Sequence, residues 1–237
     1  MSDGRLPNGV AKSRILEAAQ ALFADVGFET ASFRDITARA GVSLSAIHYH
    51  FGSKLGILEE IFSEHARRLT EQRAALLHHV SHDAEGRPVL DSVLEAFLRP
   101  SFLPLNGESN DMFNKLRLRL SVEATPVIRG ILGDAFDVSD RGFIAALAEA
   151  LPDRSESSIY WRFHFMVGAM LYTMADPGQL EGLSHGACSS ADSTYALKHM
   201  VSAFSAAFRA LEADPASTSR PARAAAGKPR RKPVQRA

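Results

Sequence analysis

Two short segments with helix-capping residues at their ends lie next to each other between Ser32 and Lys54. Ser32 and Ser43 each stand where a side-chain oxygen can accept a hydrogen bond from a backbone N–H of a helix's first turn. Gly41 follows the first segment, at the position where a left-handed residue commonly ends a helix. Each segment has one apolar face: Ile36 and Ala40 in the first, Ile47 and Phe51 in the second. The spacing predicts two short helices joined by a tight Gly-Val-Ser turn, with a third helix starting at Lys54.

This arrangement is typical of a helix-turn-helix, in which the second helix lies in the DNA major groove with its N-terminal residues on base edges. The residues of that helix expected to face outward are Leu44, Ser45, Ala46, His48, Tyr49 and His50. The pattern therefore predicts a protein that reads double-stranded DNA.

Residues 14–58 resemble the N-terminal domain of the tetracycline-repressor (TetR) family of bacterial transcription regulators, over about the first quarter of the chain. The residues that carry the resemblance are Phe23, Gly27, Phe28, Asp35-Ile36, Ala40-Gly41-Val42-Ser43, Tyr49-His50-Phe51 and Lys54. The chain departs from the family pattern at Leu44, where a Lys or a small residue is usual, and at His48, where a Tyr is usual. The DNA sequence that it reads therefore cannot be taken from a better-known relative.

The resemblance implies DNA-contacting roles at nine positions. Ser32 and Ser43 match positions that use hydroxyl and backbone N–H groups on phosphates, and Tyr49 and Lys54 match further phosphate contacts. The positions expected near base edges or the backbone are Leu44, Ser45, Ala46, His48 and His50. Side-chain chemistry allows Leu44 or Ala46 to contact a thymine methyl group and His48 to donate to a guanine acceptor.

Helical periodicity and the absence of alternating β-branched runs predict an all-α fold of about nine helices. We expect a helix-turn-helix domain at residues 10–54, an effector-binding and dimerisation domain at 55–213, and a disordered basic tail at 214–237. The formal net charge of the 237 residues is zero, but the tail carries seven Lys or Arg and one Asp. Overall neutrality does not exclude a DNA reader, which needs only a local basic face.

Prolines and glycines set the expected helix boundaries in the second half of the chain. The expected helices run from Lys54 to about His79, from Pro88 to a stop at Pro100 and Pro104, from Asp111 to about Glu123, from Pro126 to Leu151 with a kink or break near Gly133, from Ser155 to Ala175, and from about Ala191 to Leu211. Residues 176–190 are expected to form a loop.

The last two long helices are the expected dimer interface. The first is apolar on most faces and the second carries a heptad-like seam, so we expect them to form half of a four-helix bundle completed by a second subunit. The interface residues predicted for this homodimer are Phe163, Val167, Gly168, Met170, Leu197, Val201, Phe204 and Phe208. The alternative is that these two helices form an intramolecular core.

A small-molecule effector pocket is expected in the same domain, since bundle cores supply apolar walls with a few polar groups. The candidate residues are Phe113, Arg117, Trp161, His164 and Phe165. Arg117 or Arg119 could pair with a carboxylate. The C-terminal half is similar to the branch of the family with PsrA-like C-terminal domains, which makes an acyl thioester or fatty acid the first expectation and an aromatic carboxylate the second. The alternative is that these aromatic residues only fill the core.

These features predict a ligand-responsive regulator, and the family resemblance suggests a repressor bound as a homodimer to a palindromic operator. No cofactor or metal is expected. No membrane partner is expected either, because the longest apolar patch, residues 165–175, is too short to cross a bilayer. We therefore expect a soluble cytoplasmic protein. Cys188 lacks an activating motif, and no carboxylate or Cys completes a metal site with His78 and His82. An effector-independent DNA-architectural protein and a small helical enzyme remain as alternatives.

Overall fold

The structure is a computed structural model that describes residues 8–103, 111–123, 125–175 and 178–211, and all its regular elements are helices. The ten helices are α1 (Asn8–Val26), α2 (Phe33–Ala40), α3 (Leu44–Phe51), α4 (Lys54–His78), α5 (Leu90–Phe102), α6 (Asp111–Val122), α7 (Pro126–Ala150), α8 (Glu156–Met174), α9 (Gln179–Leu183) and α10 (Ser193–Arg209). The all-α prediction is confirmed. The helix that was not expected is the short α9, which falls within the loop expected at residues 176–190. The expected tail at 214–237 lies outside the described residues.

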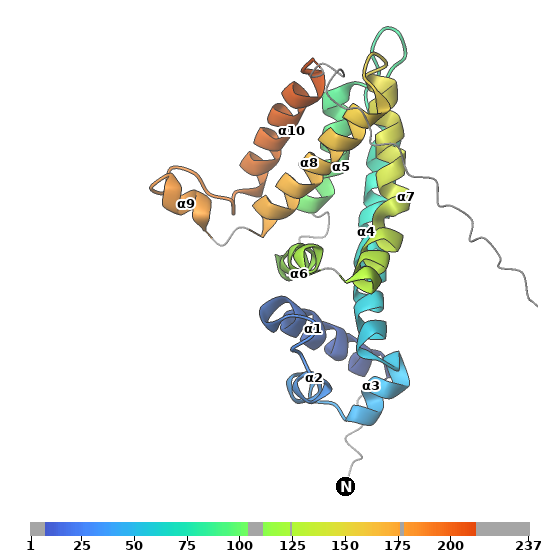
Figure 1. Cartoon of the computed structure of the whole chain (residues 1–237), viewed down its shortest axis with the longest axis vertical. Helices are drawn as coiled ribbons and strands as arrows, with labels where there is room; N and C mark the ends of the chain where they lie inside the picture. The colour runs from blue at the N-terminus through green and yellow to red at the C-terminus, as the bar shows by residue number, and fades with distance from the viewer. Residues whose placement is uncertain (1–7, 104–110, 124, 176–177, 212–237) are drawn as a thin grey trace, which may run out of the picture.

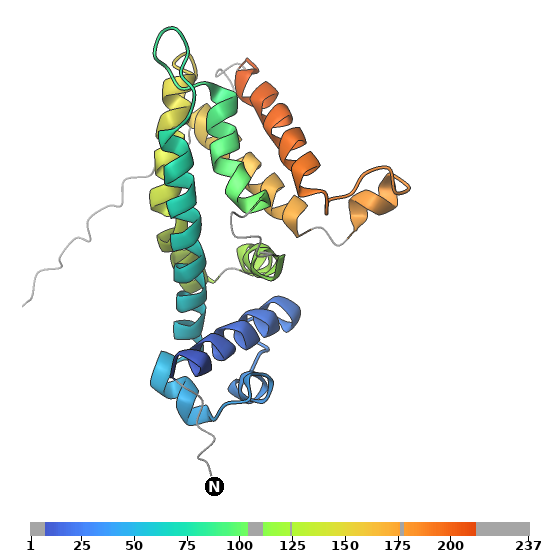
Figure 2. The same cartoon turned by 180° about the vertical axis from the view of Figure 1, so that it is seen from behind.

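The helices form two groups that are joined by α4 and α7 (Figure 1). Helices α1, α2 and α3 gather at one end of the molecule, and α5, α8 and α10 gather at the other, as the view from behind also shows (Figure 2). Helix α6 lies between the two groups, and α4 runs alongside α7 through most of the molecule's length. None of the described helices is long and apolar enough to cross a membrane.

Two hydrophobic clusters correspond to the two groups. The first cluster joins α1, α2 and α3 to the N-terminal halves of α4 and α7, and includes Phe23, Phe62 and Phe136. The second cluster joins α5, α8, α10 and the C-terminal half of α7, and is centred on Phe97 and Phe143. Both α4 and α6 contribute side chains to the two clusters, since their C-terminal Leu76 and Leu118 pack against the second. The N-terminal helices therefore share their core with the helices that follow them.

Several boundaries differ from those expected. Pro88 precedes α5 instead of starting it, and Pro100 is buried inside α5. Proline removes one backbone N–H, but this loss falls near the helix end, and Leu103 N closes the last turn on Arg99 O at 2.7 Å. Helix α7 runs without interruption past Gly133. Its buried residues Phe136, Phe143 and Leu147 hold one face against its neighbours, so packing outweighs the low helix propensity of glycine.

A polar contact fastens α10 to α5 beside the second cluster. Ser205 Oγ donates to Asp91 Oδ1 at 2.5 Å, and Arg209 Nη2 lies 2.9 Å from the same oxygen. The hydrogen bond from Ser205, followed by the interactions with Arg209, lowers the pKa of Asp91 below its ordinary value. A carboxyl group whose pKa is lowered by folding stabilises the fold above its unfolded pKa, and this stabilisation disappears as the pH falls through the folded pKa.

We expect Asp91→Asn to lower the free energy of unfolding by about 0.5–1 kcal/mol at pH 7, a modest loss because the pair is half exposed. The difference from the wild-type protein should shrink below about pH 4, where the carboxylate itself protonates. Urea unfolding at several pH values measures this. Asp153→Asn, at an exposed position, is the matched control. A pH-independent difference would contradict the assignment.

Candidate nucleic-acid interface

The predicted caps of α2 form a complete capping box. Asp35 N donates to Ser32 Oγ at 3.2 Å, and Ser32 N donates to Asp35 Oδ2 at 3.1 Å. The hydrogen bond from the Ser32 side chain, followed by that from its backbone, lowers the pKa of Asp35. Gly41 ends the helix in the left-handed conformation, with φ at +65°. Local sequence therefore determines both ends of α2, which in turn set the turn that leads into α3.

Helix α3 is buried on one side only. Ser43 caps it by accepting from Ala46 N at 3.4 Å, and Ile47 is its one fully buried residue. Leu44 and Tyr49 are 49% and 75% exposed. Among the predicted DNA contacts, the exposed residues are Ser32, Ser43, Leu44, Ser45, His48 and Tyr49, and the half-buried ones are Ala46, His50 and Lys54. The surface expected for a recognition helix is therefore present.

The His48 ring contacts α2 and the residue that ends its own helix. Its ring packs against Phe33 with centroids 5.3 Å apart, and its Nδ1 lies 3.2 Å from Gly52 O. A carbonyl oxygen can only accept, so this hydrogen bond requires the proton on Nδ1 and makes Nε2 an acceptor in the neutral ring. Neutral His48 is therefore suited to an amino group of adenine or cytosine. The donation to guanine predicted from the sequence requires the doubly protonated ring.

Lys54 makes structural contacts that the sequence did not indicate. Its Nζ donates to Glu29 O at 3.1 Å and to Ala31 O at 3.0 Å, and lies 4.7 Å from the centroid of the Phe28 ring. The ammonium group thereby ties the start of α4 to the loop between α1 and α2. An ammonium has three donors, so the predicted phosphate contact would use the third.

The turn from α3 into α4 requires a residue without a side chain at Gly56. A Cβ atom there would lie 2.3 Å from Phe51 O. Ser53 caps α4 as predicted, by accepting from Gly56 N at 3.0 Å. This close approach fixes the angle between the two helices, and nothing in the sequence signalled it, because the contact depends on the fold.

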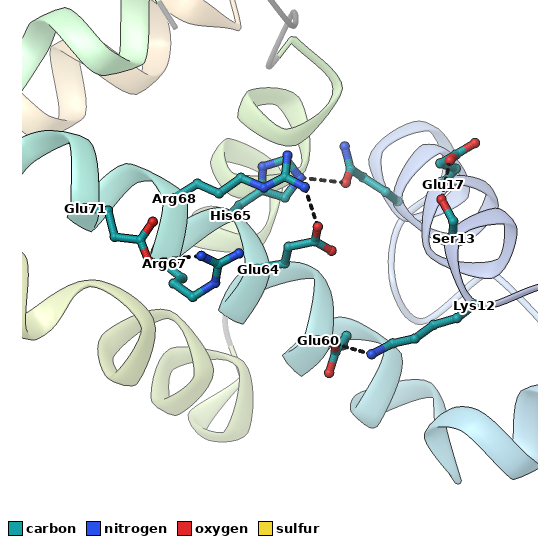
Figure 3. A network of polar contacts seen from close by, with 10 residues as sticks. Lys12, Ser13, Glu17, Glu60, Glu64, His65, Arg67, Arg68 and Glu71 are labelled. Carbon is teal, nitrogen blue, oxygen red and sulfur yellow. Dashed lines mark hydrogen bonds and ion pairs between the residues drawn. The ribbon is translucent and has the colours of Figure 1, made fainter. Parts of the chain in front are cut away.

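Polar contacts hold α1 against α4 (Figure 3). Lys12 Nζ lies 2.6 Å from Glu60 Oε1, and His65 Nε2 lies 3.1 Å from Gln20 Oε1. Within α4, Arg68 pairs with Glu64. These contacts border a charged groove of about 890 Å³ between the two helices. They orient α1, on which α2 and α3 pack, relative to the long helix.

Arg119 connects α6 to the end of α1. Its Nη1 donates to Ala24 O at 3.2 Å and to Asp25 O at 2.9 Å, and its Nε donates to Glu123 Oε1 at 2.7 Å. A cation suits these carbonyls because they carry the negative end of the helix dipole. Gly27, with φ at +95°, makes room for the contact, since a Cβ atom there would lie 2.9 Å from Arg119 Nη2.

The structure places the five predicted pocket residues in two groups, one buried on α6 and one exposed on α8. Phe113 and Arg117 are buried on α6. Trp161, His164 and Phe165 are exposed on α8, with Trp161 and Phe165 59% and 57% exposed. Periodicity located a face of α8 correctly but could not tell whether that face meets another helix of the same chain.

Most of the predicted interface residues belong to the core of the single chain. Phe163, Met170, Leu197 and Phe208 are buried in the second cluster, while Val167, Val201 and Phe204 are half-buried against it, and only Gly168 is exposed. This burial within one chain is what the intramolecular alternative predicts for this face. The opposite face of α8 carries the exposed residues Tyr160, Trp161, His164, Phe165, Gly168 and Tyr172.

A capped helix-turn-helix with an exposed second helix, joined to a larger helical domain, defines the class of DNA-binding transcription regulators. Two family models agree with this class. Residues 15–61 match "Bacterial regulatory proteins, tetR family", and residues 95–207 match "Tetracyclin repressor-like, C-terminal domain". Together the matches span more than half of the chain, which belongs to the TetR family of transcription regulators. The expectation of a regulator instead of an enzyme is confirmed by this membership.

Among curated proteins, the HTH-type transcriptional activator FasR of Mycolicibacterium smegmatis is 31% identical over 93 residues. That match covers 39% of this chain and 41% of the relative, so it spans less than half of that protein's length.

Solved structures share the fold at low identity. A transcriptional regulator from Saccharomonospora viridis in complex with choline has a TM-score of 0.54 and 22% identity, over 83% of this chain and 94% of that one. The fatty acid degradation regulator FadR from Bacillus halodurans has a TM-score of 0.57 and 15% identity, over 85% and 96%. These values establish the fold alone.

We expect His48→Ala to change the base preference of the protein and Tyr49→Phe to weaken binding evenly. Loss of a base-edge contact should alter discrimination at one position of the DNA site by about 1–3 kcal/mol, whereas loss of a phosphate contact carries no sequence information. Mobility shifts on the DNA site and its single-base variants measure both effects. An equal loss on every sequence for His48→Ala would contradict its role.

Proposed function

We propose that the protein is a ligand-responsive regulator that binds a pseudo-palindromic operator as a homodimer in the cytoplasm and is released by a small-molecule effector. The observation that carries this proposal is the position of α6. Its buried Arg117 belongs to the interior of the larger domain, while its Arg119 holds the end of α1. A movement of α6 would therefore change the orientation of α1 and, through it, of α3.

Repression is the proposed sign of regulation, based on the resemblance of the N-terminal domain to tetracycline repressors. The relative FasR is named an activator, but it matches over only part of its length. Both a repressor and an activator can be released from DNA by an effector, so the proposed ligand response does not depend on the sign of regulation.

The proposed effector is an acyl thioester or a fatty acid, with an aromatic carboxylate as the second choice. The first choice rests on the resemblance that the sequence of the C-terminal half suggests to the branch with PsrA-like C-terminal domains. FadR of Bacillus halodurans, whose fold is similar, is named a fatty acid degradation regulator, whereas the Saccharomonospora viridis regulator was solved with choline.

We assign the dimer interface to the exposed face of α8 together with the exposed side of α10. An exposed aromatic patch on a globular protein commonly marks an interaction site. The exposed side of α10 carries small side chains that allow another helix to approach closely: Ser202, Ala203, Ala206 and Ala207. Because α10 packs on α5 and α8 packs on α7 with their inner sides, a second copy can complete a four-helix bundle with the outer sides.

Phe165→Asp should give a monomer that loses most of its operator affinity, since a charge would be buried at the centre of the proposed bundle. Light scattering and mobility shifts measure the two effects. Val138→Asp is the matched control, because Val138 is an 81% exposed apolar residue on α7. A Phe165→Asp protein that keeps the mass of a dimer would refute this interface.

The experiment that tests the proposed function is a mobility shift on the DNA flanking the protein's own gene. It should be repeated with acyl thioesters, fatty acids and aromatic acids. Specific binding released by one class supports the ligand-responsive regulator and identifies the effector's chemistry. Specific binding that no compound releases favours the effector-independent architectural alternative.

A further inference from the structure

Three charged side chains from three helices meet in the interior between the two hydrophobic clusters. Arg73 of α4 has no exposed surface, Arg117 of α6 is 7% exposed, and Asp140 of α7 is largely buried. Arg117 packs 3.9 Å from the centroid of Phe136 in the first cluster. Arg73 packs 3.6 Å from the centroid of Phe97 in the second. Asp140 is the carboxylate that interacts with both arginines, whereas the neighbouring Asp137 pairs with Arg141, so the two buried cations outnumber the carboxylate between them.

The contacts of Arg73 leave part of its guanidinium unsatisfied. Its Nε donates to Phe97 O at 3.0 Å and its Nη2 to Ser101 Oγ at 3.5 Å. Its Nη1 lies 3.5 Å from Asp140 Oδ1, and neither of these two atoms has a hydrogen-bond partner among the described residues. Buried charged groups are ordinarily paired and hydrogen-bonded, because the cost of removing them from water is otherwise not offset.

Arg117 has still fewer partners. Within the described part of the chain its guanidinium makes no hydrogen bond, and its interactions are the Phe136 ring and the charges of Asp140 and Arg73. Burial lowers the pKa of Arg73 to about 9 and that of Arg117 to about 10, and Asp140 partly counters both shifts. Burial raises the pKa of Asp140 above its ordinary value; both arginines oppose this shift and the nearby Asp137 adds to it. All three groups are therefore less favourable as ions here than in water.

We propose that Arg117 and Arg73 form the anion-binding end of the effector site and that the effector is a small organic carboxylate with an apolar body. This inference rests on the proposed function and names the chemical class of its ligand. One carboxylate added beside Asp140 would balance the two arginines. Its oxygens would accept hydrogen bonds from the Arg117 guanidinium and from Arg73 Nη1, which is buried without a hydrogen-bond partner among the described residues.

The surroundings fit an apolar body. The Phe136 ring, against which Arg117 packs, lies 6.4 Å from the Phe62 ring between centroids, and the Phe62 ring lies 5.1 Å from that of Phe113. Arg117 therefore borders a run of aromatic rings. The three charged residues lie on α4, α6 and α7, so a ligand entering between them must move these helices apart. Arg119 lies two residues from Arg117 and would carry such a movement to α1.

The test uses the full-length protein and pairs of compounds that differ only in charge: octanoate with octanamide, decanoate with decanamide, and benzoate with benzamide. Near saturation, at least one carboxylate should raise the Tm by about 5 °C or more while its amide does not. Arg117→Met should weaken the binding of that carboxylate at least tenfold. Lys115→Met, which removes an exposed cation from the same helix, should leave the affinity for that carboxylate unchanged. If no carboxylate exceeds its amide, or if Lys115→Met has the same effect as Arg117→Met, the assignment is overturned.

The ligand-free variants give a second readout. Arg117→Met removes the excess charge and should leave the Tm unchanged or higher, whereas Asp140→Asn leaves two unpaired cations and should lower it. A Tm for Arg117→Met that falls as far as that of Asp140→Asn would make Arg117 a structural residue and overturn the proposal.

Operator release separates this inference from the proposed function. If an uncharged compound releases DNA equally from the wild-type protein and from Arg117→Met, the ligand-responsive regulator stands and the anion site is overturned. If the carboxylates raise the Tm through Arg117 but no compound releases DNA, the anion site stands and the proposed regulation fails.

Discussion

The structure depends on α4, one continuous helix whose N-terminal part packs in the first hydrophobic cluster and whose C-terminal end packs against the second. Its 25 residues span about 37 Å at 1.5 Å per residue. Near its start, Ile57, Leu58 and Phe62 pack with the DNA-reading helices, and near its end Leu76 packs with the second cluster. Because an α-helix in well-packed surroundings transmits displacement as a unit, a shift at either end must be accommodated at the other. The N-terminal domain is therefore not an independent module on a flexible linker.

Much of the N-terminal third was predictable because its determinants are local. Capping side chains and the left-handed Gly41 act within a few residues of the helix ends that they fix, so sequence alone contains the needed information. The contacts of Lys54 with Glu29 and Ala31 were not predictable, because they join residues more than twenty positions apart. The same holds for Gly56. Glycine is required there only because the turn from α3 into α4 brings Phe51 O close to its Cα.

The C-terminal half was predictable in its class and helix ranges but not in its faces. Periodicity assigns Phe163 and Trp161 to different sides of α8 without stating which side meets the rest of the chain. Only the positions of α5 and α7 decide this, and they bury Phe163 and leave Trp161 exposed. The pairing of Arg73 with Asp140 was missed for a related reason, because α4 and α7 are brought together by tertiary packing.

In the function that we propose, the buried arginines and the exposed aromatic face would meet two different requirements of a ligand-controlled dimer. A dimer interface must be present whether or not an effector is bound, so it is best formed by apolar side chains such as Trp161 and Phe165 on helices that are fixed on their inner sides. A switch needs an interior that is less stable without its ligand. Unbalanced charge at Arg73 and Arg117 meets this need, because the fold tolerates it only through the packing around it. Helix α6 carries the second of these arginines and also the residue that holds α1, so the least satisfied part of the interior lies next to the contact that orients the DNA-reading helices.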